Sequence, residues 1–398
     1  MRWTRKLQLV IPTLLVVTAC GAPETPQAQN NAPATVPDKP SKPVELNVLD
    51  VAGNLQLTQG MIDEFAKSNP DYVSKVNYTK ATAPDMPGKL KAEQNSGTSQ
   101  THLVLTGTDG LSSVIEQKLV YELLPGYSAK LPDLEKTYLP PAWEMQKLAQ
   151  GQGVAVTYYP AGPLLEYDPA KVPTAPMSPA ELLEWAKAHP GKFQYARPAN
   201  SGPGRTFLMG LPYLLGDKDP KDPENGWDKT WAYLKDLGQY VDNYPGGTTD
   251  VMKNLANGTS WMVASTTGWD INPRVLGSVP EGMRISTFKG FHWVTDAHYA
   301  VVPKGVSQDV LSANLALIKF MLDPKQQAKA YDKGYFYPGP AVKDVTLQMA
   351  PQESQDAIAK FGRAEYDKLI ADNPKETSLP AAQQVKAFQR WDREIGKK

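Results

Sequence analysis

The sequence predicts an α/β protein built from two lobes, each with a mostly parallel sheet flanked by helices. Strand-like and helix-like segments alternate over residues 45–117, which is the pattern of a parallel sheet. A second series of such segments starts after residue 160. The chain from residue 44 to residue 398 also exceeds the size at which one hydrophobic core usually divides.

The first half alternates strands with helices. Residues 45–51 alternate apolar and polar side chains, as a half-buried strand does. Further strands are expected at 73–78 and 102–106, and helices at 55–67, 86–95 and 111–117. This β-α-β-α-β-α order favours parallel pairing, because each helix returns the chain to the same edge of the sheet.

The second half begins after a strongly apolar strand at 153–159. Ser178 and Glu181 form a capping box around Pro179, which predicts a helix over 180–189. The remaining expected elements are strands at 193–196, 260–265 and 298–305, helices from about 205, over 227–240 and over 381–395, and a mainly helical chain from 311.

The N-terminus has the pattern of an export signal. Basic residues precede an uncharged, mostly apolar stretch at 7–19, which is too short to cross a bilayer. Val17-Thr-Ala-Cys20 follows and resembles the bacterial lipobox, in which the cysteine is acylated. Cys20 is the only cysteine of the chain. Residues 1–19 are therefore predicted to be a lipoprotein signal peptide, against the alternative of a spare cysteine beside an ordinary cleavage site.

The segment after Cys20 is predicted to be a flexible tether. Residues 20–43 are rich in Pro, Ala, Gln and Asn and have almost nothing to bury, so they cannot offset the entropy of ordering. We therefore expect an exported protein, lipid-anchored to the cell membrane and facing the periplasm or the cell exterior.

Charge and motifs exclude several function classes. The 42 basic residues equal the 42 acidic ones, and loss of Arg2, Arg5 and Lys6 with the signal leaves a net charge of −3. No Lys/Arg run suits nucleic acid, so no such partner is expected. The sequence has no G-x-S-x-G elbow, H-E-x-x-H motif or P-loop. We therefore expect that the protein is not an enzyme and that it binds no cofactor or metal.

Several segments together resemble the two-lobed extracellular solute-binding proteins of bacterial ABC importers, in the branch for thiamine, polyamines and iron. Beside the lipobox and the 46–51 strand, they are HLVLTGTDGLSSVIEQKLVYELLP (102–125), GVAVTYYP (153–160), HPGKFQYARPANSGPGRTFL (189–208), NGTSWMVASTTGWD (257–270) and HYAVVPKG (298–305). The resemblance implies a type II periplasmic-binding-protein fold, a monomer that binds a small solute in an interlobe cleft and delivers it to the transmembrane subunits of an ABC permease.

The resemblance also implies lobe boundaries. Residues 44–153 and about 304–398 would form lobe 1, with the C-terminal helices shared, and residues 154–303 would form lobe 2. Hinge strands would lie near 154–159 and 299–303. Closure about such a hinge would bury the solute.

Candidate ligand-binding residues follow from one rule. In open α/β sheets, ligands meet the loops beyond the carboxyl ends of strands. The residues selected in this way are Asn54, Thr108, Asp109, Tyr158, Tyr159, Ser201, Arg205, Trp269, Asp270, Asp296 and His298.

These candidates leave the solute open. Trp269 and Asp270 suit an organic cation, thiamine-like or polyamine-like, by cation–π attraction and charge pairing. Arg205 and the glycine-rich turn before it suit an anion at a helix start. Each residue also has a structural interpretation: Asp109 as a helix cap, Trp269 as a packed ring and His298 as a core side chain.

Three other predictions complete the sequence argument. The iron-binding members carry a tyrosine pair where this chain has Thr-Thr-Gly-Trp (266–269), so iron is not expected. The aromatic run 335–337 could reach the cleft or lie in the core, and Trp293 lies just before the second hinge strand. The alternatives to a solute-binding protein are an exported hydrolase that uses Asp296 and His298, or a surface scaffold on the same fold.

Overall fold

The computed structural model describes residues 35–397. The predicted signal peptide, Cys20 and most of the predicted tether lie outside these residues. Val36, near the start of the described chain, packs into the first hydrophobic core, and Lys130 binds the neighbouring Asp38 at 2.7 Å. No helix within residues 35–397 combines the length and apolar character needed to cross a bilayer.

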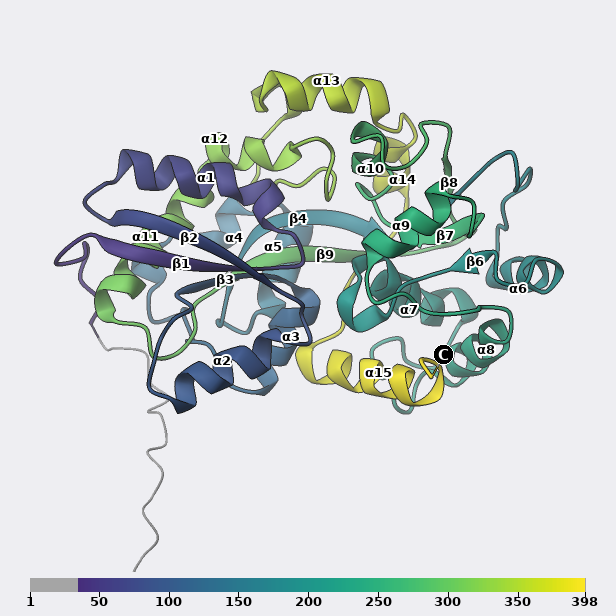
Figure 1. The fold of residues 1–398 in the computed structure, drawn as a ribbon, viewed down its shortest axis with the longest axis horizontal. Helices are drawn as coiled ribbons and strands as arrows, with labels where there is room; N and C mark the ends of the chain where they lie inside the picture. The colour runs from purple at the N-terminus through teal and green to yellow at the C-terminus, as the bar shows by residue number, and fades with distance from the viewer. Residues whose placement is uncertain (1–34, 398) are drawn as a thin grey trace, which may run out of the picture.

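The first sheet has six strands, in the order β10-β9-β3-β1-β2, with β4 paired to β9 (Figure 1). Its strands are β1 (Val44–Val51), β2 (Val73–Ala81), β3 (Leu103–Gly107), β4 (Val154–Gly162), β9 (Trp293–Val301) and β10 (Lys375–Thr377). β1 pairs in parallel with β2 and β3, as predicted, whereas β9 runs antiparallel to both β3 and β4.

Helices cover both faces of this sheet, with α1 above and α2 and α3 below in Figure 1. Met61 and Phe65 lie one turn apart on α1 and are both buried, because the apolar residues of this helix recur at helical spacing. The helices of this half are α1 (Leu55–Ser68), α2 (Met86–Asn95), α3 (Thr108–Glu116), α4 (Leu134–Thr137), α5 (Pro140–Leu148), α11 (Gln308–Met321) and α12 (Pro324–Gln327).

The second sheet has four short strands, in the order β6-β7-β5-β8. They are β5 (Leu164–Tyr167), β6 (Phe193–Gln194), β7 (Met262–Ser265) and β8 (Arg284–Ser286). Only β6 and β7 pair in parallel, so the expectation of a mostly parallel sheet is wrong for this half. The antiparallel pairings come from β5 and β8, which are too short to show a strand pattern in the sequence.

Most helices of the second half were predicted, but two of the short ones were not. They are α6 (Pro179–Ala188), α7 (Gly202–Leu215), α8 (Asp228–Gly238), α9 (Thr248–Ala256), α10 (Asn272–Val275), α13 (Gln352–Phe361), α14 (Tyr366–Asp372) and α15 (Ala381–Glu394). Ser178 caps α6 by accepting the N–H of Glu181, as the capping box predicts. The two that were not predicted are α9 and α10: α10 spans only four residues, whereas α9 buries Val251, Met252 and Leu255 at helical spacing, a signal that was missed.

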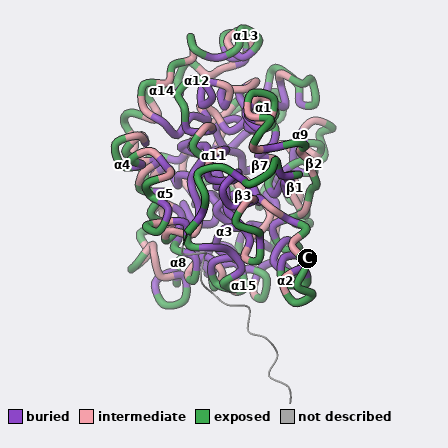
Figure 2. The backbone as a smooth tube through the Cα atoms, turned by 90° about the vertical axis from the view of Figure 1, so that its left-hand side faces the viewer, coloured by how far each residue is buried: buried purple, intermediate pink, exposed green. Residues whose placement is uncertain are grey.

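Two large hydrophobic cores lie in the interior, where buried backbone concentrates in Figure 2. β9 belongs to both, because Trp293 and Val294 pack in the second core and Tyr299 to Val301 in the first. The C-terminal helix α15 also reaches both halves: Ala381 packs in the first core, and Phe388 and Trp391 in the second.

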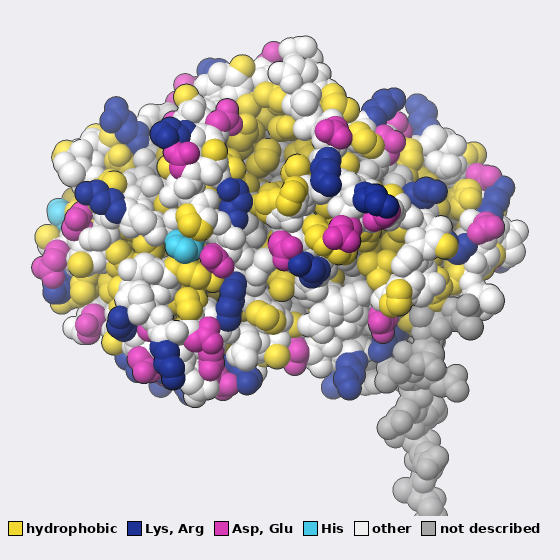
Figure 3. Space-filling model, turned by 180° about the vertical axis from the view of Figure 1, so that it is seen from behind, with side chains coloured by type: hydrophobic (Ala, Val, Ile, Leu, Met, Phe, Trp, Pro, Cys, Tyr) yellow, Lys and Arg dark blue, Asp and Glu magenta, His cyan; other side chains and the backbone are white. Residues whose placement is uncertain are grey.

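The surface has no field of a single charge on the face seen in Figure 3, where acidic and basic side chains are interspersed. This distribution agrees with the equal numbers of acidic and basic residues in the chain. Interspersed charges do not attract polyanions at long range.

Candidate functional site

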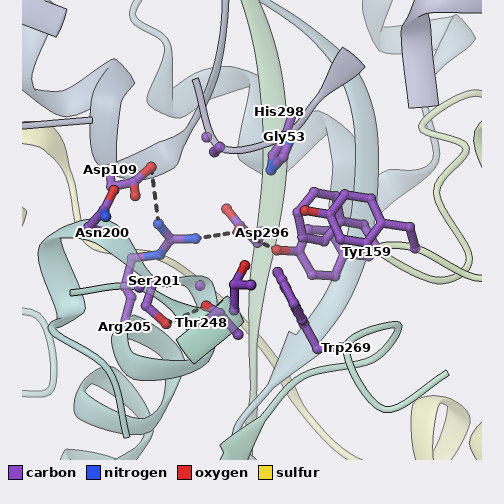
Figure 4. A pocket seen from close by; sticks show the side chains of 17 residues that line it. Gly53, Asp109, Tyr159, Asn200, Ser201, Arg205, Thr248, Trp269, Asp296 and His298 are labelled. Carbon is purple, nitrogen blue, oxygen red and sulfur yellow. Dashed lines mark hydrogen bonds and ion pairs between the residues drawn. The ribbon is translucent and has the colours of Figure 1, made fainter. Parts of the chain in front are cut away.

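A cavity of about 250 Å³ lies where loops from the two halves meet (Figure 4). Seven of the predicted ligand-binding residues line it: Asp109, Tyr159, Ser201, Arg205, Trp269, Asp296 and His298. The other lining residues are Ala52, Gly53, Gly107, Asn200, Gly202, Gly247, Thr248, Thr249, Tyr335 and Phe336. The loops after β1, β3 and β7 all contribute, as the strand-end rule predicts.

A buried ion cluster occupies one part of the cavity. Arg205 on α7 donates from Nη2 to Oδ2 of Asp296 on β9, and its Nη1 lies 3.4 Å from Oδ1 of Asp109 on α3. Tyr159 donates its hydroxyl to Oδ2 of Asp296 at 2.6 Å, and Thr108 donates to Oδ1 at 2.6 Å. The charged side chains are nearly fully buried, so this pairing is poorly screened.

Burial and charge set the protonation of the cluster. Burial raises the pKa of Asp109 above its ordinary value, although Arg205 opposes the shift. Burial alone would lower the pKa of Arg205, but Asp296 and Asp109 together raise it. His298, also in the cavity, has its pKa lowered to about 4 by burial, so its ring is neutral at pH 7. Two acidic groups therefore share the cavity with one fixed cation.

Aromatic rings form a second part of the wall. Tyr159 stacks on Phe336 with ring centroids 4.8 Å apart, and Phe336 meets His298 edge to face at 4.4 Å. Trp269 meets Tyr335 at 5.5 Å, also edge to face. Trp269 is partly exposed, so part of its indole is available to a solute.

The loop that carries Trp269 is fixed by a close approach of backbone. Gly268 has a φ of +96°, and a Cβ at this position would lie 2.4 Å from the backbone nitrogen of Phe336. Only glycine fits such a contact without displacement. This packing holds the 266–270 loop against the loop that supplies Tyr335 and Phe336.

Helix starts form a third part of the wall. Ser201 caps α7 by accepting the N–H of Gly204 at 3.1 Å, and its hydroxyl lies 2.8 Å from that of Thr248 at the start of α9. The N-terminal ends of α7 and α9 both border the cavity. Helix N-termini carry partial positive charge, so the charge of this part of the wall is opposite in sign to that of the carboxylates.

Four predicted residues do not line the cavity. The side chain of Asn54 accepts the hydroxyl of Thr58 at 2.7 Å, and Tyr158 packs in the first core because it faces away from Tyr159 on the same strand. Thr108 lies behind Asp296, to which it donates. Asp270 turns into a buried network.

Asp270 is bound by groups from the C-terminal part of the chain. It accepts from Nε of Arg363 at 2.8 Å and from the hydroxyl of Tyr366 at 2.5 Å. Its side chain has no exposure. The predicted pairing of Trp269 with Asp270 as one receptor is therefore not what the geometry offers, since only the indole reaches the cavity.

Some cavity residues were missed or left open by the sequence argument. Tyr335 and Phe336 reach the cavity, whereas Tyr337 and Trp293 pack against or in the second core. Residues 247–249 were missed, although Gly-Gly followed by Thr-Thr-Asp is a recognisable helix start. β9 begins at Trp293 rather than at His298 because Thr295 and Asp296 are polar but buried.

Two features of the described chain concern metal ligands and His298. Residues 35–397 contain no group of three His, Cys, Asp or Glu side chains placed to hold a metal ion. Nδ1 of His298 is buried without a hydrogen-bond partner, so nothing among these residues orients the ring as a general base.

Comparison with known proteins identifies the family. Residues 60–361 match the family model described as bacterial extracellular solute-binding protein. No curated protein sequence matches the chain significantly.

Solved structures share the fold. The spermidine/putrescine ABC transporter substrate-binding protein PotD of Streptococcus pneumoniae has a TM-score of 0.59 at 14% identity, covering 88% of this chain and 99% of its own. The periplasmic binding protein AfuA of Actinobacillus pleuropneumoniae, with fructose-6-phosphate bound, has a TM-score of 0.62 at 16% identity, with coverages of 89% and 99%. The apo ferric ion-binding protein A of Pasteurella haemolytica has a TM-score of 0.59 at 15% identity, covering 88% of this chain and 97% of its own. These similarities confirm the predicted two-lobed type II fold.

Proposed function

Since this chain belongs to the bacterial extracellular solute-binding proteins, we propose that it captures a small organic cation in the cavity around Asp109, Arg205 and Asp296. This proposal rests on one observation: two buried carboxylates share a single buried guanidinium in a cavity lined by aromatic rings. An excess acidic group and the partly exposed indole of Trp269 attract a cation.

Anionic cargo is the second candidate. The N-terminal ends of α7 and α9, together with Arg205, favour a negative group. Both carboxylates already bind or face Arg205, so an incoming anion would have to compete with them. The excess negative charge therefore favours the cation.

The two lobes are proposed to close on the solute through β4 and β9. These strands pair with each other and carry Tyr159, Asp296 and His298 into the cavity. In Figure 1 both strands extend between the half that contains β1 and the half that contains β7, in opposite directions. A hinge in these strands, near 154–159 and 299–303, would couple solute contact to closure.

Delivery is proposed to go to the transmembrane subunits of an ABC permease. The structural neighbour PotD is itself described as an ABC transporter substrate-binding protein. We propose that the protein acts as a monomer, held at the membrane by an acylated Cys20, and that it catalyses no reaction. Metabolic labelling with a radioactive fatty acid tests the anchor: the label should appear in the wild type and be lost in Cys20→Ala.

A thermal-shift screen of the purified protein, stripped of bound solute, tests the cargo. A solute at 100 times its Kd should stabilise the protein by about 2.7 kcal/mol, which raises Tm clearly. We expect stabilisation by organic cations such as thiamine, choline or polyamines. Stabilisation by small anions or sugar phosphates alone would contradict the proposal.

A further inference from the structure

Arg205 is a cation that the chain itself places in the cavity. Its side chain is about 2% exposed and bridges Asp296 and Asp109, which are 1% and 6% exposed. In Figure 4 the guanidinium lies between the two carboxylates. The guanidinium stays charged at any physiological pH, so it permanently offsets one of the two acidic groups.

The carboxylate oxygens show what is left for a solute. Asp296 is fully used: Oδ2 accepts from Arg205 and Tyr159, and Oδ1 accepts from Thr108 and from the backbone N–H of Ala297 at 2.9 Å. This carboxylate has no acceptor position left that is free of the chain.

Only one carboxylate oxygen of Asp109 has partners within the described chain. Its Oδ1 accepts the backbone N–H of Gly110 at 3.0 Å and faces Nη1 of Arg205 at 3.4 Å. No hydrogen bond from residues 35–397 reaches its Oδ2. Oδ2 of Asp109 is thus the oxygen of the ion cluster that remains for an ammonium group.

The rest of the cavity disfavours a second cation. His298 points towards the centre of the cavity and presents a neutral ring (Figure 4). The N-terminal ends of α7 and α9 carry partial positive charge at the wall that contains Ser201 and Thr248. A second ammonium group would meet these ends and Arg205 without a free carboxylate to pair with.

We propose that Arg205 restricts the cavity to solutes with a single positive charge, whose ammonium group binds Oδ2 of Asp109. The inference rests on the proposed function, because it assumes that an organic cation is captured at this site. Such a cavity selects thiamine-like or choline-like cargo over di- and polyamines. Arg205 is thereby assigned as the residue that determines specificity by charge.

Calorimetric titration of the purified wild-type protein tests the inference with four probes: choline, thiamine, putrescine and spermidine. We expect at least one singly charged probe to bind at least about tenfold more tightly than either polyamine, because an unpaired second charge is poorly tolerated in a buried site. Tighter binding of putrescine or spermidine would overturn the inference and leave the proposed function intact. Binding of none of the four would overturn both.

Two variants separate charge from other effects. Arg205→Met leaves two carboxylates unpaired, and we expect it to shift the preference towards putrescine by at least about tenfold. Arg284→Met removes an exposed arginine of the same half and should leave the preference unchanged. An unchanged preference in folded Arg205→Met would overturn the inference.

A third variant covers the case in which Arg205→Met does not fold. Asp109→Asn keeps the shape of the side chain and the pair between Arg205 and Asp296, but removes the charge that would bind the ammonium. This variant should bind the singly charged probe at least about tenfold more weakly than the wild type does. Unchanged affinity in this variant would overturn the assignment of Asp109.

Discussion

Arg205 on α7 and Asp296 on β9 form a buried ion pair that joins two elements 91 residues apart in the chain. Breaking such a pair leaves an uncompensated charge in the interior. Arg205→Ala should therefore lower the free energy of unfolding by about 3–5 kcal/mol, as measured by urea denaturation without solute. The double variant Arg205→Met/Asp296→Asn should recover part of this loss. An equal or greater loss in the double variant would contradict the pairing argument.

Trp269 should contribute to solute binding more than to folding, because its indole borders the cavity and is partly exposed. Trp269→Ala should weaken binding of an organic cation by about 1–2 kcal/mol, as measured by titration calorimetry. Trp185→Ala is the control, since Trp185 is also partly exposed but stacks on His189 in the second half, outside the cavity. Equal loss of affinity in both variants would count against a role for Trp269.

Gly268 should tolerate no side chain. Its φ is +96°, and a Cβ would collide with the backbone around Phe336. Gly268→Ala should destabilise the protein by more than about 2 kcal/mol. Gly277→Ala is the matched control, because Gly277 also has a positive φ, +66°, but open space around it; its cost should stay near 1 kcal/mol. Equal Tm changes in the two variants would show that the collision is relieved.

His298 should make stability fall in mild acid. Its pKa is lowered by burial to about 4, whereas the unfolded chain has an ordinary histidine pKa near 6.5. The unfolded state therefore binds a proton between these pH values that the folded state does not, and stability decreases as pH falls from about 6.5 to about 4. His298→Gln should flatten this part of the profile by up to about 3 kcal/mol. Urea denaturation across this range checks it.

Glu166 should produce the opposite slope. Burial, together with repulsion from Asp270, raises its pKa to about 8, so the folded state keeps a proton that the unfolded state has lost above about 4.5. Stability attributable to this group is therefore present below pH 4.5 and decreases as pH rises to about 8. Glu166→Gln should stabilise the protein at pH 8 by roughly 2–4 kcal/mol and change little at pH 4.5. A similar effect at both pH values would contradict this.

The elements with clear periodicity were predictable from the sequence. β1, α1, α2 and the capped helix α6 agree with the predictions to within a residue or two. β8 and β10 span three residues each, which is too short for a pattern to be seen. They form because the neighbouring strands have backbone N–H and C=O groups available for pairing, which depends on tertiary structure and not on local sequence.

The cavity was predictable where it follows strand ends and unpredictable where it depends on side-chain direction. Asp109 and Trp269 follow the ends of β3 and β7, whereas Tyr159 lies inside β4, which is longer than predicted. Trp269 and Asp270 are neighbours in sequence but point to different surroundings, because Arg363 and Tyr366 hold the carboxylate. Residues more than 90 positions away decide that direction, and no local pattern contains them.

The position of Asp296 and His298 on β9 limits how specificity could be re-engineered. β9 pairs with β3, β4 and β10 and packs into both hydrophobic cores, so a change in it disturbs backbone ladders as well as the cavity. The start of α9 at Thr248 and Thr249 lies outside every ladder and still borders the cavity. Libraries that aim at new cargo should therefore vary these loop and helix-start positions and leave the shared strand untouched.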